Sequence, residues 1–198
     1  MVLGSKLRFD DNPLFDQPTA YRSLIAALQY LTMTRPDLSF AMNKLSQFLK
    51  APIVNHWHAC KHVLHYIQGT LHHGLTFRQG STLQLKGYVD VDWASSLSHR
   101  KSTSSYCIFL GSNLGQWSSK KHQVVALSST KAEYRALPQA SIEIIWLQNL
   151  FQELHVSIPG IPVLWCDNTS AGALAFDPIF HARTKHIEID VHFVQEMV

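Results

Sequence analysis

The residues best suited to chemistry are acids at the predicted ends of secondary-structure elements. Asp90 and Asp92 follow one predicted strand, and Asp167 follows another. Glu133 lies in the first turn of a long predicted helix. Carboxylates that converge repel one another unless cations lie between them, and such hard oxygen ligands favour Mg²⁺ or Mn²⁺. Two such ions can activate a water and stabilise the leaving oxygen in phosphodiester hydrolysis.

The elements that must position these acids are two strands and the helix between them. Alternating polarity predicts a strand over 83–89, a short apolar run predicts a buried strand over 161–166, and helical spacing predicts a helix over 130–154. A long helix between two strands permits a right-handed parallel crossover. If the strands are neighbours, Asp90 and Asp167 emerge side by side at their carboxyl ends, where open α/β sheets bind ligands.

Two of the acids also fit ordinary structural roles. Asp167 would serve equally well as the cap of a short helix predicted directly after it. The pattern Thr130-x-x-Glu133 fits a capping box, in which Glu133 only starts its helix. The spacing by itself leaves both helix capping and a metal cluster open.

The pattern as a whole predicts an α/β fold, with a mixed sheet flanked by helices and a helical subdomain before it. Pro36 is expected to open the second helix of that subdomain. The other predicted elements are an extended leader at 1–19, two helices within 20–50, a helix at 54–68, hairpin strands at 104–110 and 114–118, and helices at 168–175 and 184–197.

Composition bounds the class of protein. The chain has 198 residues, of which 46% are hydrophobic and 16% charged, so it can bury a core and is not a disordered segment. Its formal net charge of +3 permits a nucleic-acid partner without demonstrating one. The three scattered cysteines, Cys60, Cys107 and Cys166, argue against a disulfide framework. With no signal peptide and no membrane span in the sequence, we expect an intracellular protein that is not secreted.

The sequence resembles the ribonuclease H region of Ty1/copia-type retrotransposon Pol polyproteins, from about residue 20 to the end. The matching motifs are Tyr21-Arg22-Ser23-Leu24-Ile25-Ala26-Ala27-Leu28-Gln29-Tyr30-Leu31, Thr34-Arg35-Pro36-Asp37-Leu38, His56-Trp57, Gly69-Thr70-Leu71, Asp90-Val91-Asp92-Trp93-Ala94, Arg100-Lys101-Ser102-Thr103-Ser104, Trp117-Ser118-Ser119-Lys120-Lys121, Ala126-Leu127-Ser128-Ser129-Thr130, Ala132-Glu133-Tyr134, Cys166-Asp167-Asn168-x-Ser170-Ala171 and His181-x-Arg183-Thr184-Lys185-His186-Ile187.

The resemblance implies an RNase H-like fold over 79–198 and a helical connection subdomain over 20–78. It implies metal-dependent cleavage of the RNA strand of RNA–DNA hybrids, with two Mg²⁺ or Mn²⁺ ions and no small-molecule cofactor. By motif match, Asp90, Glu133 and Asp167 are the catalytic, metal-binding acids, and Asp92 belongs to the first motif. The implied partners are the hybrid and the reverse transcriptase domain of the same polyprotein, and the implied compartment is a cytoplasmic particle or the nucleus.

The chain also departs from the family pattern. The fourth acid of such nucleases belongs to a later segment, so the last strand and helix of the fold are expected to be missing. Lys131 stands where the family usually has an acid, Ser105 where it usually has glycine, and Pro138 falls inside the long helix. The alternative function is therefore a catalytically inactive retroelement remnant that binds nucleic acid weakly or has no activity.

Cationic and hydroxyl side chains flank the predicted acidic edge. Cations would contact the hybrid backbone and hydroxyls its minor groove, although a solvated basic surface explains them too. The candidates are Arg100, Lys101, Ser102, Trp117, Lys120, Lys121, Ser128 and Ser170.

Histidines at 58, 62 and 65 share a predicted helix. His58 and His62 have the i, i+4 spacing of zinc ligands. An exposed histidine-rich face explains them more simply.

Overall fold

The computed structural model describes residues 7, 13–80, 82–95 and 100–176, with the backbone alone from 173 onward. The chain divides into two compact units, Met1–Thr76 and Phe77–Val198, each with its own hydrophobic core. The predicted helix at 184–197 and most of the predicted leader at 1–19 lie outside the described residues. Among the described helices, none is long and apolar enough to cross a membrane.

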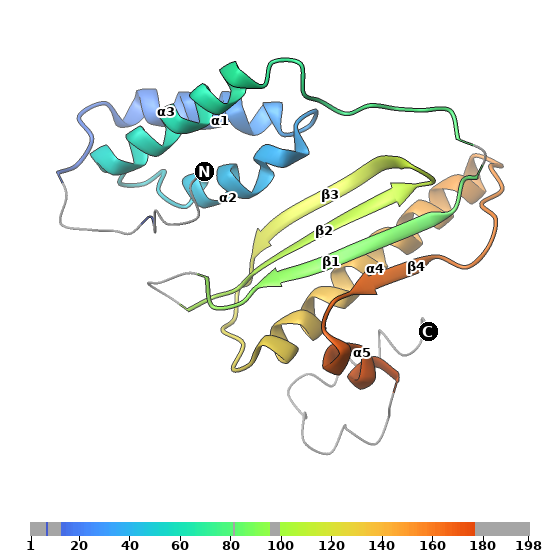
Figure 1. The fold of residues 1–198 in the computed structure, drawn as a ribbon. Helices are drawn as coiled ribbons and strands as arrows, with labels where there is room; N and C mark the ends of the chain where they lie inside the picture. Colours follow the sequence, from blue (N-terminus) through green and yellow to red (C-terminus); the bar gives the residue numbers. More distant parts are fainter. Residues whose placement is uncertain (1–6, 8–12, 81, 96–99, 177–198) are drawn as a thin grey trace. The chain divides into compact units, whose positions relative to one another are not determined.

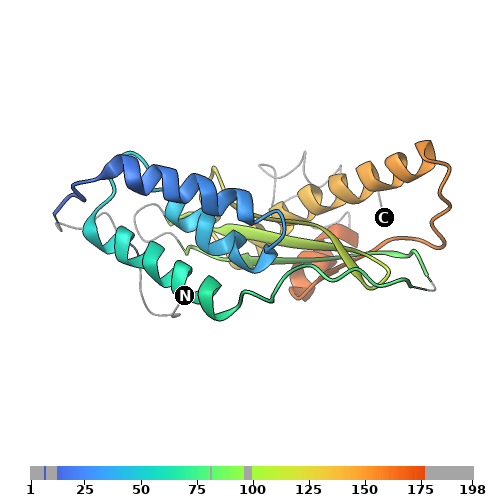
Figure 2. The same cartoon turned by 90° about the horizontal axis from the view of Figure 1, so that it is seen from above.

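The first unit is helical, as the sequence predicts (Figure 2). Its elements are α1 (Pro18–Leu31), the 3-10 turn η1 (Pro36–Leu38), α2 (Ser39–Ser46) and α3 (Val54–Gly69). Apolar residues at helical spacing form its core, and the buried Tyr21 hydroxyl donates to the Leu45 carbonyl at 2.8 Å. The helices therefore pack against one another through apolar faces.

A buried arginine holds the turn before α2 against the end of α3. The Arg35 side chain is 5% exposed, and its Nη2 lies 2.7 Å from Asp37 Oδ2. Its Nη1 donates to the Thr70 carbonyl at 3.0 Å. Since the guanidinium is hydrogen-bonded on both sides, this buried charge is satisfied within the unit.

The second unit contains a four-stranded mixed sheet in the order β3-β2-β1-β4 (Figure 1). Its strands are β1 (Leu85–Asp92), β2 (Thr103–Leu110), β3 (Asn113–Lys121) and β4 (Val163–Cys166). The pairs β1–β2 and β2–β3 are antiparallel, and β1–β4 is parallel. The fold is thus α/β, and the parallel crossover predicted between the first and last strands is confirmed.

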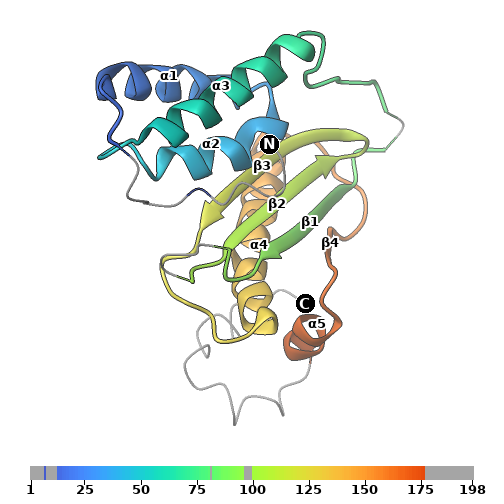
Figure 3. The same cartoon turned by 60° about the vertical axis from the view of Figure 1, so that its left-hand side comes forward.

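The helix α4 (Ser129–Glu153) crosses one face of this sheet, and α5 (Thr169–Phe176) follows β4 (Figure 3). Alternate residues of β1 are buried beneath α4, among them Val89 and Val91. A Cβ at Gly87 would lie 2.7 Å from Leu164 Cδ1, so a larger residue there would force the Leu164 side chain to shift. Pro138 is buried inside α4, which continues through it.

The hairpin is longer than predicted. The turn occurs at Gly111, whose φ of 61° favours glycine, but β3 begins at Asn113 and reaches Lys121 rather than ending at residue 118. The polar end of β3 is a strand because Lys120 pairs with Ser104 and Lys121 with Thr103. Cross-strand pairing, which local polarity does not reveal, sets its length.

Candidate metal centre

The strand register brings two of the predicted acids to the same edge of the sheet. Val89 of β1 is the partner of Cys166 of β4 in the parallel pair. Asp90 comes directly after Val89, and Asp167 comes directly after Cys166; both aspartates are exposed. β1 continues to Asp92, so Asp90 lies within its strand rather than after it as predicted, whereas Asp167 directly follows β4. The parallel pairing still brings the two carboxylates to the same end of neighbouring strands.

The third acid reaches this rim from the helix. Glu133 lies in the second turn of α4 and is 6% exposed. Ligand atoms of Glu133, Cys166 and Asp167 all lie within 4.8 Å of one another. Among the described residues, Asp90 is not part of this group, which joins the two carboxylates of Glu133 and Asp167 to the thiol of Cys166.

Electrostatics connect Asp90 to the same group. The pKa of Glu133 rises from 4.5 to about 7, first because of burial and then because of the negative charges of Asp167 and Asp90. A buried carboxylate close to other carboxylates favours its protonated form. The charges of Asp90 and Asp167 therefore act on Glu133, so the three acids share one electrostatic environment.

The two capping alternatives for these acids are wrong. Ser128 caps α4, since its backbone is extended and its Oγ accepts from the Lys131 N–H at 3.2 Å. The box predicted from Thr130 to Glu133 therefore does not start this helix. Asn168 caps α5, because its Oδ1 accepts from the Ala171 N–H at 3.0 Å.

Cys166 is the member of the cluster that sequence reasoning missed. Its Sγ lies 3.8 Å from Glu133 Oε2, with the thiol as donor. Burial is the main cause of the raised pKa of Cys166. Cys166 is paired with the buried Val89 and packs against the same core. The alternation of inward and outward residues along the strand was therefore the sequence signal that could have placed the Cys166 side chain on the core side of the sheet.

Asp92 does not join the close group. It ends β1 opposite Thr103 and is exposed, two residues beyond Asp90. Alternation along the strand gives both aspartates the same face of the sheet. The participation of Asp92 in a metal site remains a prediction.

The predicted nucleic-acid ligands differ in their accessibility. The Ser102 side chain is fully buried and its Oγ accepts from the Ala94 N–H at 3.1 Å, while Ser128 serves as the α4 cap. Internal hydrogen bonds thus occupy both hydroxyls. Arg100, Lys120 and Ser170 are exposed, and Lys101, Trp117 and Lys121 are half-buried.

The histidine-rich helix shows no metal geometry. His58, His62 and His65 all lie on α3 and are exposed. Among the described residues, the clustering of ligand atoms that could hold an ion includes none of them. The ring centroids of His62 and His65 are 6.4 Å apart and edge-on, which is an aromatic contact.

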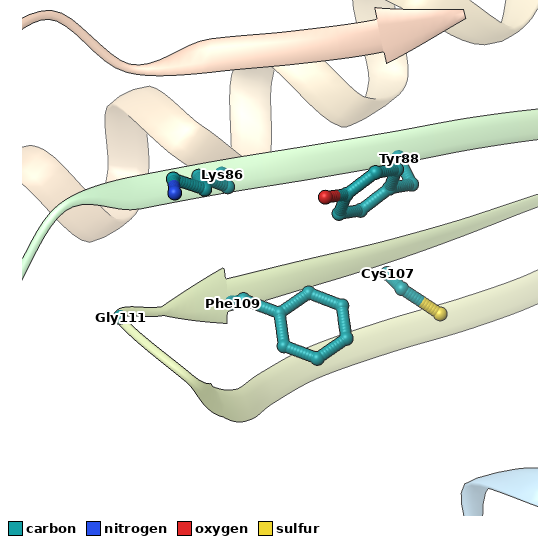
Figure 4. Close-up of a pocket in the computed structure, with 5 residues that line it drawn as sticks. All are labelled: Lys86, Tyr88, Cys107, Phe109 and Gly111. Atoms are coloured by element: carbon teal, nitrogen blue, oxygen red, sulfur yellow. The ribbon is translucent and has the colours of Figure 1, made fainter. Parts of the chain in front are cut away.

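A separate pocket lies on the sheet face opposite α4 (Figure 4). Its lining residues are Lys86, Tyr88, Cys107, Phe109 and Gly111. The rings of Tyr88 and Phe109 meet edge-on, with centroids 5.8 Å apart. None of these lining side chains is a carboxylate, so the pocket is distinct from the acidic rim.

The chain is similar along its length to Pol polyproteins of plant transposons. It is 43% identical over 198 residues to the retrovirus-related Pol polyprotein from transposon RE2 of Arabidopsis thaliana, covering 100% of this chain and 14% of that protein. The corresponding protein of transposon RE1 is 42% identical, with the same coverage. That of transposon TNT 1-94 of Nicotiana tabacum is 40% identical over 179 residues, 90% of this chain and 13% of that protein.

The chain belongs to the copia-type retrotransposon Pol family. No family model and no solved structure matches it. The chain spans about one seventh of the length of these Pol polyproteins. The four-stranded mixed sheet flanked by helices is consistent with the RNase H-like fold that the resemblance implies.

Proposed function

We propose that this Pol segment hydrolyses the RNA strand of RNA–DNA hybrids in a reaction that requires Mg²⁺ or Mn²⁺. The observation that carries the proposal is the close approach of Glu133 to Asp167, whose ligand atoms lie within 4.8 Å of each other, with Asp90 near enough for its charge to raise the pKa of Glu133. With the capping roles excluded, the described structure gives these acids no other partner that explains their grouping.

The donor set fits hard divalent ions. Asp90 and Asp167 are exposed, whereas Glu133 is buried without a cationic partner among the described residues. A buried carboxylate lacking a counter-ion is costly, and oxygen ligands of this kind suit Mg²⁺ and Mn²⁺. When bound, such ions supply an activated water and stabilise the departing oxygen of a phosphodiester.

The protein side chains have separate tasks in this proposal. Glu133 anchors the centre from the rigid helix α4, and Asp90 and Asp167 extend it toward solvent, where a phosphate backbone can approach. The exposed Arg100 lies just before the start of β2 and the exposed Lys120 lies at the end of β3, and both would contact phosphates. Such contacts strengthen binding without reading sequence.

A labelled-hybrid assay tests the proposal. The full chain should cleave the RNA strand only with Mg²⁺ or Mn²⁺, and Asp90→Asn should reduce the rate at least a hundredfold. Lys50→Gln, a change in the separate helical unit, is the matched control and should cleave normally. Wild-type protein that is folded but cleaves no faster than Asp90→Asn would refute the proposal and favour an inactive remnant.

A further inference from the structure

A thiol stands inside the carboxylate cluster. Cys166 Sγ is 3.8 Å from Glu133 Oε2, and both lie within 4.8 Å of a ligand atom of Asp167. We propose that these three side chains form a binding site for a thiophilic divalent ion such as Zn²⁺, which excludes the oxygen-preferring ions from the same rim. The inhibitory consequence rests on the proposed nuclease function, but the binding site itself does not.

The geometry is close to what zinc requires. With Zn–S near 2.3 Å and Zn–O of about 2.0–2.2 Å, tetrahedral coordination separates sulfur and oxygen ligands by roughly 3.5 Å. The thiol and Glu133 oxygen are already 3.8 Å apart, and the three ligand atoms lie within 4.8 Å of one another. Small side-chain rotations complete a three-ligand site, with water at the fourth position.

The burial of Glu133 independently points to a cation. The side chain is 6% exposed, and no lysine, arginine or histidine of the described residues forms an ion pair with it. Its contact with Cys166 is a long thiol hydrogen bond, a weak substitute for a counter-ion. An ion bound between them would neutralise the buried carboxylate.

The thiol determines which ion is preferred. Mg²⁺ selects oxygen ligands, whereas a thiolate favours zinc and other softer ions. On binding, the S–H bond of Cys166 breaks, its proton passes to the buffer, and a zinc–sulfur bond forms with no change in oxidation state.

Cobalt absorption tests the site without reference to activity. Metal-free full-length protein titrated with Co²⁺ should develop a thiolate-to-cobalt charge-transfer band, and Zn²⁺ should abolish it. Cys166→Ser should lose the band and weaken zinc binding by more than about tenfold, the least effect seen even for residues that only support metal ligands. Cys107→Ser is the matched control, since Cys107 is a half-buried thiol in the pocket on the other sheet face.

Each outcome decides the proposal. Absence of the band in wild-type protein, or its persistence in Cys166→Ser, would overturn it. If Cys166→Ser does not unfold cooperatively, Asp167→Asn serves instead: it should keep the band but require more cobalt, and unchanged affinity would count against the site. Hybrid cleavage with Mg²⁺ is measured separately, so a missing nuclease activity and a missing zinc site are told apart.

Discussion

Neutralising Glu133 should stabilise the metal-free protein at neutral pH. The side chain is 6% exposed and its pKa is raised by burial and by the charges of Asp167 and Asp90. Its ionised form is therefore disfavoured in the folded state. Glu133→Gln keeps the shape of the side chain and removes the charge, so it should remove this cost.

The size and the pH window follow from the pKa of Glu133. It rises from 4.5 to about 7, which at roughly 1.36 kcal/mol per pH unit amounts to about 3 kcal/mol. Below about pH 4.5 the carboxyl is protonated in both states and costs nothing. As the pH rises toward 7 the unfolded state loses the proton first, so the free energy of unfolding falls, and above about pH 7 the whole cost is present.

Urea unfolding with a chelator measures this effect. Glu133→Gln should exceed wild type in free energy of unfolding by about 3 kcal/mol near pH 8, and the two should converge near pH 4. Glu153→Gln, an exposed change at the other end of α4, is the matched control and should show no such divergence. A Glu133→Gln protein no more stable than wild type near pH 8 would refute the electrostatic reasoning.

Three other perturbations have defined outcomes. Gly87→Ala should cost about 1–3 kcal/mol in urea unfolding, because its Cβ would lie 2.7 Å from Leu164; an unchanged value would contradict that packing. Arg35→Ala should cost roughly 2 kcal/mol, a discounted value because its partner Asp37 is partly exposed, and should speed amide exchange in the first unit. Mg²⁺ at about 100 times its Kd should stabilise wild type by about 2.7 kcal/mol, and Asp167→Asn should abolish most of this shift in thermal unfolding.

The sequence allows the broad plan of the site to be predicted because strand order follows from general rules. A long helix between two strands implies a parallel crossover, and the observed pairing of Val89 with Cys166 brings Asp90 and Asp167 to one rim. The helix beginning at Ser129 was likewise predictable to within one residue.

The finer details depend on tertiary contacts that local patterns do not contain. Ser128 and Thr130 are equally suitable cap residues, and the extended backbone at Ser128 decides between them. Cys166 looks like an ordinary core residue until α4 brings Glu133 to its thiol. The distance of Asp90 from the tight group also depends on how side chains pack at the rim.

A crystal of the full chain soaked in Mn²⁺ tests the central claim most directly. We expect anomalous manganese density bonded to Glu133 and Asp167, with Asp90 completing the coordination of at least one ion. Clear density for the three side chains with no manganese between them, or with Asp90 turned away from any ion, would contradict a shared metal centre.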